Sequence, residues 1–182
     1  MAFRFRSFAG ACLLLLPALL VLHPGDLAAQ EKHRYSFKAP PGTSKYTQTH
    51  VLEVGDVPRH QLRIAELQSK FGDDAPVYDG VKVRESRAIV FSDYVAGTGN
   101  ATLYTVSTLE NGDKVYSRGN IMARTAAGPE GGPRVTFTTV TTLTGGTGRF
   151  KSLRGTLWTT GFSDLKTGTS GTQTEGEYWF EQ

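Results

Sequence analysis

The chain has 182 residues and a formal net charge of +3, from 20 Lys and Arg against 17 Asp and Glu. Its basic residues are spread along the sequence and form no block of the kind that follows a phosphate backbone, which argues against a nucleic-acid partner. The length suffices for one domain with its own hydrophobic core, and the single cysteine excludes an internal disulfide framework.

The first 29 residues have the features of a cleavable export signal. Arg4 and Arg6 form a basic start, residues 11–22 are an apolar run too short to span a membrane as a helix, and small residues up to Ala29 fit a cleavage site. Cys12 lies at the start of the apolar run rather than after it, which disfavours a lipoprotein. We expect cleavage after Ala29, no stable membrane insertion afterwards, and a secreted or periplasmic protein without cysteine.

Residues 30–45 predict an extended N-terminal arm, and residues 46–182 predict a single β domain. In the β domain, segments rich in Val, Ile, Thr, Tyr and Phe alternate with turn residues, and no long stretch has helical periodicity. Short links such as Asn111-Gly112 favour antiparallel neighbours. The eight segments are 46–54, 60–71, 81–94, 101–110, 114–124, 134–143, 155–163 and 172–180. We expect an all-β fold: a single eight-stranded antiparallel up-and-down β-barrel with room inside for side chains or one small ligand.

The segment 60–71 contains the first candidate for chemistry. In a strand, alternation puts Leu62, Ile64, Glu66 and Gln68 on one face, and this face is the more apolar one, so we expect it to point into the barrel. An inward carboxylate loses hydration, which raises its pKa unless a cation compensates. Glu66 is therefore a candidate catalytic group. The alternative is a structural ion pair with one of three arginines, Arg84, Arg87 or Arg118.

Two possible metal sites do not match known ligand patterns. The loop 72–80 contains Asp73, Asp74 and Asp79, but it lacks the alternating oxygen ligands and final Glu of a calcium loop. His50 and His60 lie near adjoining segments, yet a catalytic zinc usually needs three close ligands. We expect no metal and no cofactor.

Aromatic residues on later segments complete the candidate site. Tyr104 and Tyr116 are placed to point a phenol into a cavity, although tyrosines of this kind more often lie at the wall with the hydroxyl in water. In the last segment the acidic residues must face solvent, so Tyr178 and Phe180 face inward, as core residues more readily than catalytic ones. Trp158 remains outside, and an exposed aromatic patch of this type often marks an interface.

A glycine-rich run, VTTLTGGTGRFKSLRG at residues 140–155, interrupts the strand pattern. Gly145, Gly146 and Gly148 permit a sharp connection, and Phe150 is the one large apolar group in this polar corner. We expect Phe150 to plug one end of the sheet before a new strand begins near Gly155. The alternative is an ordinary glycine-rich hairpin.

These motifs resemble one family. TLTGGTGRFKSLRG is similar to the GGTG-[KR]-F-x-x-x-[RK]-G signature of allene oxide cyclase-like and dirigent-like β-barrels, and the VYDG and EGEYWFE segments fit the same pattern. AELQSKF is similar to the E-[LI]-N-E-x-D strand of the cyclases, so the resemblance implies cavity positions for Glu66 and Gln68. Ser69 and Phe71 replace the second Glu and the Asp of that strand, and the cavity cysteine is lacking. The resemblance implies a calycin-like, cofactor-free barrel of an exported bacterial member that assembles as a dimer or trimer.

Two functions follow as hypotheses. In the first, the barrel is a cofactor-independent isomerase or cyclase that binds an apolar small molecule, with Glu66, Gln68 and Tyr104 as catalytic groups. Its substrate-binding residues would be Leu62, Ile64, Tyr116, Tyr178 and Phe180. In the second, the barrel is a non-catalytic ligand-binding or dirigent-type protein-interaction module, and Glu66 is a structural ion-pair member.

Overall fold

The structure is a computed structural model that describes residues 30–129, 131–164 and 170–182. The expected export signal, with Cys12, lies outside the described residues. Among the residues described, no helix has the length and apolar character needed to cross a membrane.

The described residues form one antiparallel ten-stranded sheet and one short 3-10 helix. The elements are β1 His33–Ala39, β2 Ser44–Glu53, β3 His60–Lys70, β4 Val77–Tyr78, β5 Val81–Val95, β6 Thr98–Leu109, β7 Lys114–Ala127, β8 Pro133–Gly146, η1 Gly148–Phe150, β9 Leu153–Asp164 and β10 Ser170–Phe180. The all-β antiparallel prediction is confirmed, and each of the eight expected segments coincides with a strand. The expected arm contains an additional strand, β1, which pairs with β10.

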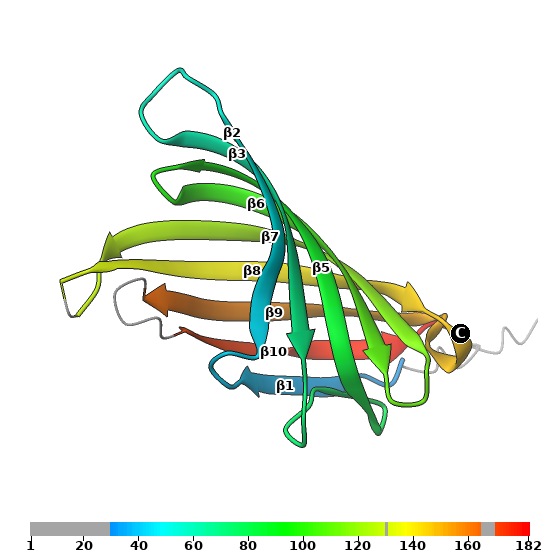
Figure 1. The fold of residues 1–182 in the computed structure, drawn as a ribbon. Coiled ribbons are helices and arrows are strands. Elements are labelled where there is room, and N and C mark those ends of the chain that lie inside the picture. The colour runs from blue at the N-terminus through cyan, green and yellow to red at the C-terminus, as the bar shows by residue number, and fades with distance from the viewer. Residues whose placement is uncertain (1–29, 130, 165–169) are drawn as a thin grey trace, which may run out of the picture.

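The strands follow the order β1-β10-β9-β8-β7-β6-β5-β3-β2, and β4 pairs with β5 alone. The sheet is twisted and curls around one side (Figure 1). The barrel-like sheet is not closed among the described residues, because β1 and β2 are its two edges and do not pair with each other. They are joined by a tight turn in which the Thr43 amide donates to the Pro40 carbonyl at 3.3 Å and Gly42 has a φ of 80°.

Cross-strand register assigns every strand residue to one of two faces, because directly opposite residues point the same way. One row runs across the sheet through Ala65, Val90, Leu103, Gly119, Thr141, Leu157, Gly176 and Tyr35. Ala65, Leu157 and Tyr35 are buried, so this is the inner face. The adjacent row runs through Glu66, Ile89, Tyr104, Arg118, Thr142, Thr156, Glu177 and Arg34, and belongs to the outer face.

The hydrophobic core cluster lies on the inner face and includes residues from β4 and η1. Its buried members are Tyr35, Tyr78, Val83, Leu109, Val115, Leu143, Phe150, Leu153, Leu157 and Tyr178. The rings of Tyr35 and Tyr78 stack with centroids 5.1 Å apart, and the Tyr178 hydroxyl accepts from the Asp79 amide at 2.8 Å. Burial raises the pKa of Tyr35 to about 12. These aromatic contacts hold the β4 hairpin against β10.

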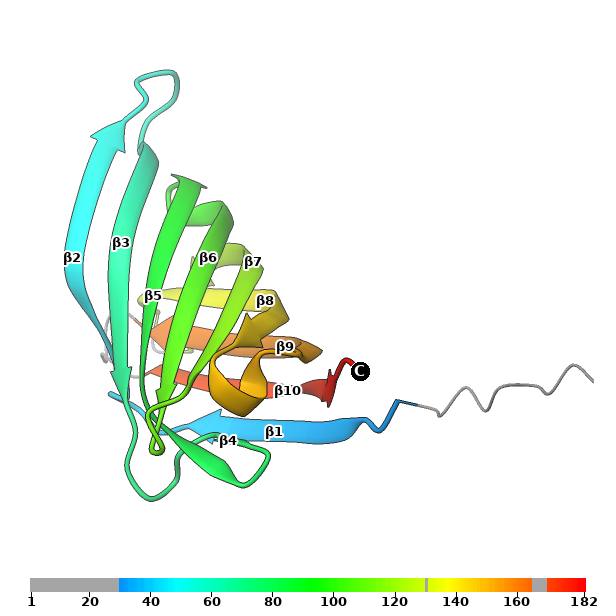
Figure 2. The ribbon, with the colours of Figure 1, turned by 90° about the vertical axis from the view of Figure 1, so that its right-hand side faces the viewer.

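The glycine-rich connection contains the short helix η1. Gly148 has a φ of 53°, and a Cβ at Gly146 would overlap the Lys114 carbonyl oxygen, so both positions need glycine. Phe150 is completely buried in the core cluster. The preceding Arg149 donates to the Asp79 carbonyl at 2.5 Å and pairs with its carboxylate at 3.3 Å, so η1 and β4 lie close together (Figure 2).

Candidate functional site

The outer face, rather than the interior, carries the candidate residues of β3. Leu62 and Ile64 are 45% and 47% exposed, whereas Ala65 is completely buried. The expectation that Leu62, Ile64, Glu66 and Gln68 point inward was therefore wrong. Both faces of β3 carry apolar residues, and alternation alone does not say which of two apolar faces meets the core.

Glu66 is held in a hydrogen-bonded ion pair on this outer face. It accepts from the Thr47 hydroxyl at 2.7 Å, from the Gln68 amide at 2.7 Å and from Arg87 Nε at 2.6 Å. The Thr47 hydrogen bond, followed by those of Arg87 and Gln68, lowers the pKa of Glu66 from 4.5 to about 2. The pKa of Glu66 does not rise, because donors and a cation compensate for its burial. The alternative of an ion pair with Arg87 is confirmed.

The remaining candidates divide between the two faces. Tyr104 lies in the outer row of Glu66 and is 55% exposed, and Tyr116 lies opposite the outer residue Val106. Tyr178 and Phe180 belong to the inner core, where their rings make an edge contact with centroids 6.2 Å apart. The structure therefore does not bring the eight expected site residues into one cavity.

Leu62 and Ile64 instead line an open groove of about 760 Å³ on the outer face, across β2, β3, β5, β6 and β7. We call it the apolar groove, defined by the side chains of Leu52, Leu62, Ile64, Phe91 and Met122. Leu52 and Met122 are 71% and 70% exposed. The polar residues along it are His50, Arg63, Ser92, Asp93, Asn100, Thr102 and Asn120. A groove with this lining can hold an apolar molecule and offer it a few hydrogen bonds.

The candidate site predicted from the sequence did not include Leu52, Phe91 or Met122. Phe91 lies opposite Ile64, and the two alternate with residues of the inner face on their own strands. The same alternation is visible in the sequence. The missing information was the register between strands, which places these side chains next to one another.

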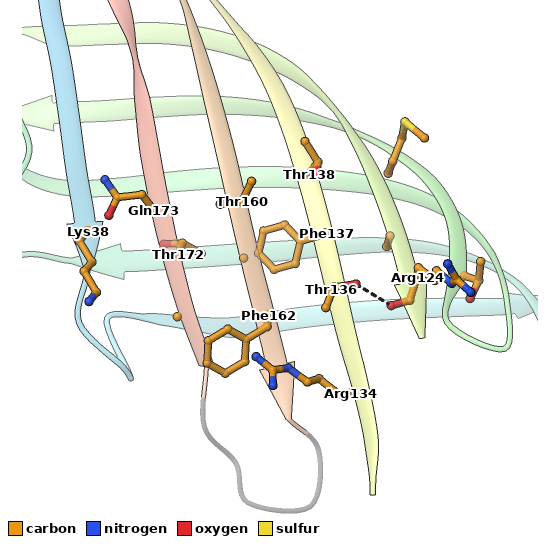
Figure 3. A pocket seen from close by; sticks show the side chains of 15 residues that line it. Lys38, Arg124, Arg134, Thr136, Phe137, Thr138, Thr160, Phe162, Thr172 and Gln173 are labelled. Carbon is orange, nitrogen blue, oxygen red and sulfur yellow. Dashed lines mark hydrogen bonds between the residues drawn. The ribbon is translucent and has the colours of Figure 1, made fainter. Parts of the chain in front are cut away.

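A second hollow, of about 790 Å³, lies further along the outer face on β7, β8, β9, β10 and β1, and shares Met122 with the apolar groove. Figure 3 shows its threonine side chains, among them Thr136, Thr138 and Thr160. The Arg134 guanidinium lies 4.0 Å from the ring centroid of Phe162. Lys38 and Arg124 add two further cations to its lining.

His60 bridges two carboxylates next to the apolar groove. Its Nδ1 lies 2.5 Å from Asp56 Oδ1, and its Nε2 lies 2.8 Å from Asp93 Oδ1. The hydrogen bonds to Asp93 and then Asp56 raise the pKa of His60, since they favour the doubly protonated ring. In the part of the chain that the structure describes, no group of three or more His, Cys, Asp or Glu is placed to hold a metal ion.

Comparison with known proteins gives a likeness in structure alone. No protein-family model and no curated protein sequence matches the chain significantly. Among solved structures, a match is the pterocarpan synthase dirigent protein, with 14% identity, a TM-score of 0.48, and coverage of 95% of this chain and 100% of that chain. At this identity neither the activity nor the site residues of that protein transfer to this one.

Proposed function

We propose that the protein is an exported, non-catalytic binding protein that holds an apolar small molecule in the apolar groove. The supporting observation is that five large apolar side chains from four strands line one groove and remain exposed. Exposed apolar surface gathered in this way is typical of a binding site. Export is inferred from the first 29 residues, whose composition fits a cleavable signal.

The state of Glu66 favours binding over the cyclase alternative. A general acid must hold a proton near neutral pH, and a carboxyl with a pKa of about 2 does not. Its oxygens already accept from Thr47, Gln68 and Arg87. Neither Glu66 nor Tyr104 lines the apolar groove, so a ligand there has no contact with the residues expected to be catalytic.

A second use of the outer face, self-association, is supported by a different set of residues. Val140 and Trp158 lie directly opposite each other on β8 and β9 and are 44% and 48% exposed. They lie outside the apolar groove. We propose that this part of the outer face joins copies of the chain into a dimer or trimer.

Binding of the uncharged probe N-phenyl-1-naphthylamine, followed by its fluorescence, tests the ligand proposal. Ile64→Ser should weaken probe binding roughly tenfold or more, because burial of one such side chain contributes about 1.5–3 kcal/mol. Val106→Ser is the matched control, since it removes an exposed β-branched residue from the same face outside the groove and outside the Val140 and Trp158 pair. Equal affinity of the two variants and the wild type would contradict the proposal. Light scattering on the same samples reports whether either variant changes the oligomeric state.

A further inference from the structure

Arg63 is one of the residues along the apolar groove, but its side chain is directed to the inner face. Arg63 alternates with Ile64 on β3 and therefore points to the opposite face, in the direction of Ala65. Its guanidinium carbon lies 5.2 Å from the ring centroid of Tyr46 and 6.0 Å from that of Tyr94. Two aromatic rings thus fix the orientation of the cation.

Arg63 has no acidic partner among the described residues, since none of the ion pairs or side-chain hydrogen bonds there includes it. Glu53, on the adjacent edge strand, instead accepts from the Gln61 amide at 2.5 Å. By contrast, the two arginines of the adjacent strand β5, Arg84 and Arg87, each pair with a glutamate. The guanidinium of an unpaired arginine can bind a carboxylate through two parallel N–H···O hydrogen bonds.

The polar atoms around Arg63 are also unsatisfied. Ser92 lies directly opposite Arg63 on β5 and is 5% exposed. Both the Ser92 hydroxyl and Arg63 Nε are buried without a hydrogen-bond partner among the described residues. Buried polar groups are nearly always hydrogen-bonded in folded proteins. Two neighbouring buried donors without a partner therefore indicate a site that can bind a hydrogen-bond acceptor.

Tyr94 gives the site a flat wall. A Cβ at Gly99 would lie 3.1 Å from Tyr94 Cδ1, so the ring lies over this glycine of β6, where a larger residue would obstruct it. Burial raises the pKa of Tyr94, so the phenol remains protonated and able to donate. The neighbouring Ala101, opposite Ser92, adds only a methyl group to the inner face.

We propose that Arg63, Tyr46, Tyr94 and Ser92 form a second binding site, on the inner face, for an organic carboxylate with a flat apolar body. The Arg63 fork binds the carboxylate, the two tyrosine rings contact the flat body, and the Ser92 hydroxyl supplies a further donor. Arg63 and Ser92 are also among the residues along the apolar groove, but alternation directs their side chains to the opposite face of the sheet, and Tyr46 and Tyr94 do not line that groove.

The test compares 2-naphthoate with its neutral analogue 2-naphthalenemethanol by calorimetric titration of the full chain. The wild type should bind 2-naphthoate at least about tenfold more tightly than the alcohol, and Arg63→Met should remove this preference. Arg63→Lys keeps the positive charge but loses the two parallel donors of the guanidinium, so it should retain part of the preference for 2-naphthoate. Arg118→Met is the matched control, because Arg118 is an exposed arginine on the outer face.

Three results would overturn the proposal. The first is equal 2-naphthoate affinity of the wild type and Arg63→Met, with both shown to be folded by circular dichroism. The second is no binding by the wild type at millimolar concentration. The third is inorganic phosphate bound as tightly as 2-naphthoate, which would assign the site to simple anions. Should Arg63→Met fail to fold, Tyr94→Leu provides a second test. Its affinity for 2-naphthoate should be about tenfold lower than that of the wild type, because one aromatic ring of the site is removed.

Discussion

Glu66 accepts hydrogen bonds from three side chains while its own side chain is only 8% exposed. Burial by itself disfavours a charged carboxylate, but donors and a neighbouring cation favour it. Here the donors prevail, since the pKa falls to about 2. The protonation state of this carboxyl is therefore determined by Thr47, Arg87 and Gln68 rather than by the sheet that surrounds it.

Glu66→Gln should change how stability depends on acid. Because the folded pKa of about 2 lies below the ordinary value of 4.5, the contribution of Glu66 is complete above about pH 4.5 and is lost as the pH falls toward 2. Urea unfolding of the wild type should therefore show a larger loss of stability between pH 6 and pH 3 than unfolding of Glu66→Gln. Glu110→Gln, at an exposed turn, should behave like the wild type. If the free energy of unfolding depends on pH in the same way for Glu66→Gln and the wild type, the ion pair makes no contribution to stability.

His60 should have the opposite dependence on pH. Its folded pKa is raised above the ordinary 6.5 by Asp93 and Asp56, so its contribution is complete below about pH 6.5 and is lost as the pH rises through the folded value. Relative to His60→Gln, the wild type should lose thermal stability between about pH 6 and pH 9. Titration of the His60 ring protons by nuclear magnetic resonance checks the cause directly. A midpoint at or below 6.5 would contradict the prediction.

At the scale of single elements, the connection from β8 to β9 combines a backbone requirement with a packing role. Glycines let the chain turn beside Lys114, and the turn places Phe150 in the core next to Phe180, with ring centroids 6.1 Å apart. Arg149 then links the turn to the β4 hairpin through Asp79. The connection from β8 to β9 is thereby bound to the β4 hairpin, although the two are far apart in the sequence.

Phe150→Ala should destabilise the protein by about 3–5 kcal/mol, because it removes a completely buried ring and leaves a cavity. Phe91→Ala is the matched control, since Phe91 is 47% exposed on the outer face and its removal creates no cavity. Chemical unfolding followed by Trp fluorescence measures both changes. A loss for Phe150→Ala no larger than that for Phe91→Ala would exclude a structural role for the turn.

The positions of the strands were predictable from the sequence, whereas their faces were not. The segment expected at 60–71 is β3, His60–Lys70, because β-branched residues and turn residues are local signals. The face of Glu66 depends on which side of β3 shares the inner face with Tyr35 and Leu157, and both are far away in the sequence. Thr47 reaches Glu66 from a bulge between Tyr46 and Gln48, which no local pattern indicates.

The edge strand β1 illustrates the same limit. Tyr35 and Phe37 alternate with polar residues as in any strand, but Pro40 and Pro41 follow soon after Phe37 and suggested an arm. Pairing with β10 makes this segment a strand, and the first proline lies just beyond the last paired residue, Ala39. The prolines therefore end the strand and do not prevent it.

At the scale of the whole molecule, the sheet has two unpaired edges and an outer face with apolar residues. Unpaired edges are usually protected by charged side chains, and β1 carries Arg34 and Lys38. The cross-strand pair Val140 and Trp158 is exposed on the outer face and is not part of the core cluster. Association of copies should thus occur through the outer face rather than through the edges.

Val140→Lys combined with Trp158→Lys should shift the protein to monomers at concentrations where the wild type associates. Two charges placed directly opposite each other in an apolar contact are costly to bury, while on an exposed surface they leave the fold intact. Light scattering across a concentration series measures the average mass, and the probe-binding assay shows whether the apolar groove survives. Thr138→Lys, a charge added at an exposed neighbouring position of β8, is the control and should leave the mass unchanged. An unchanged mass for the double variant would exclude this pair from the interface, and monomers in every sample would contradict self-association altogether.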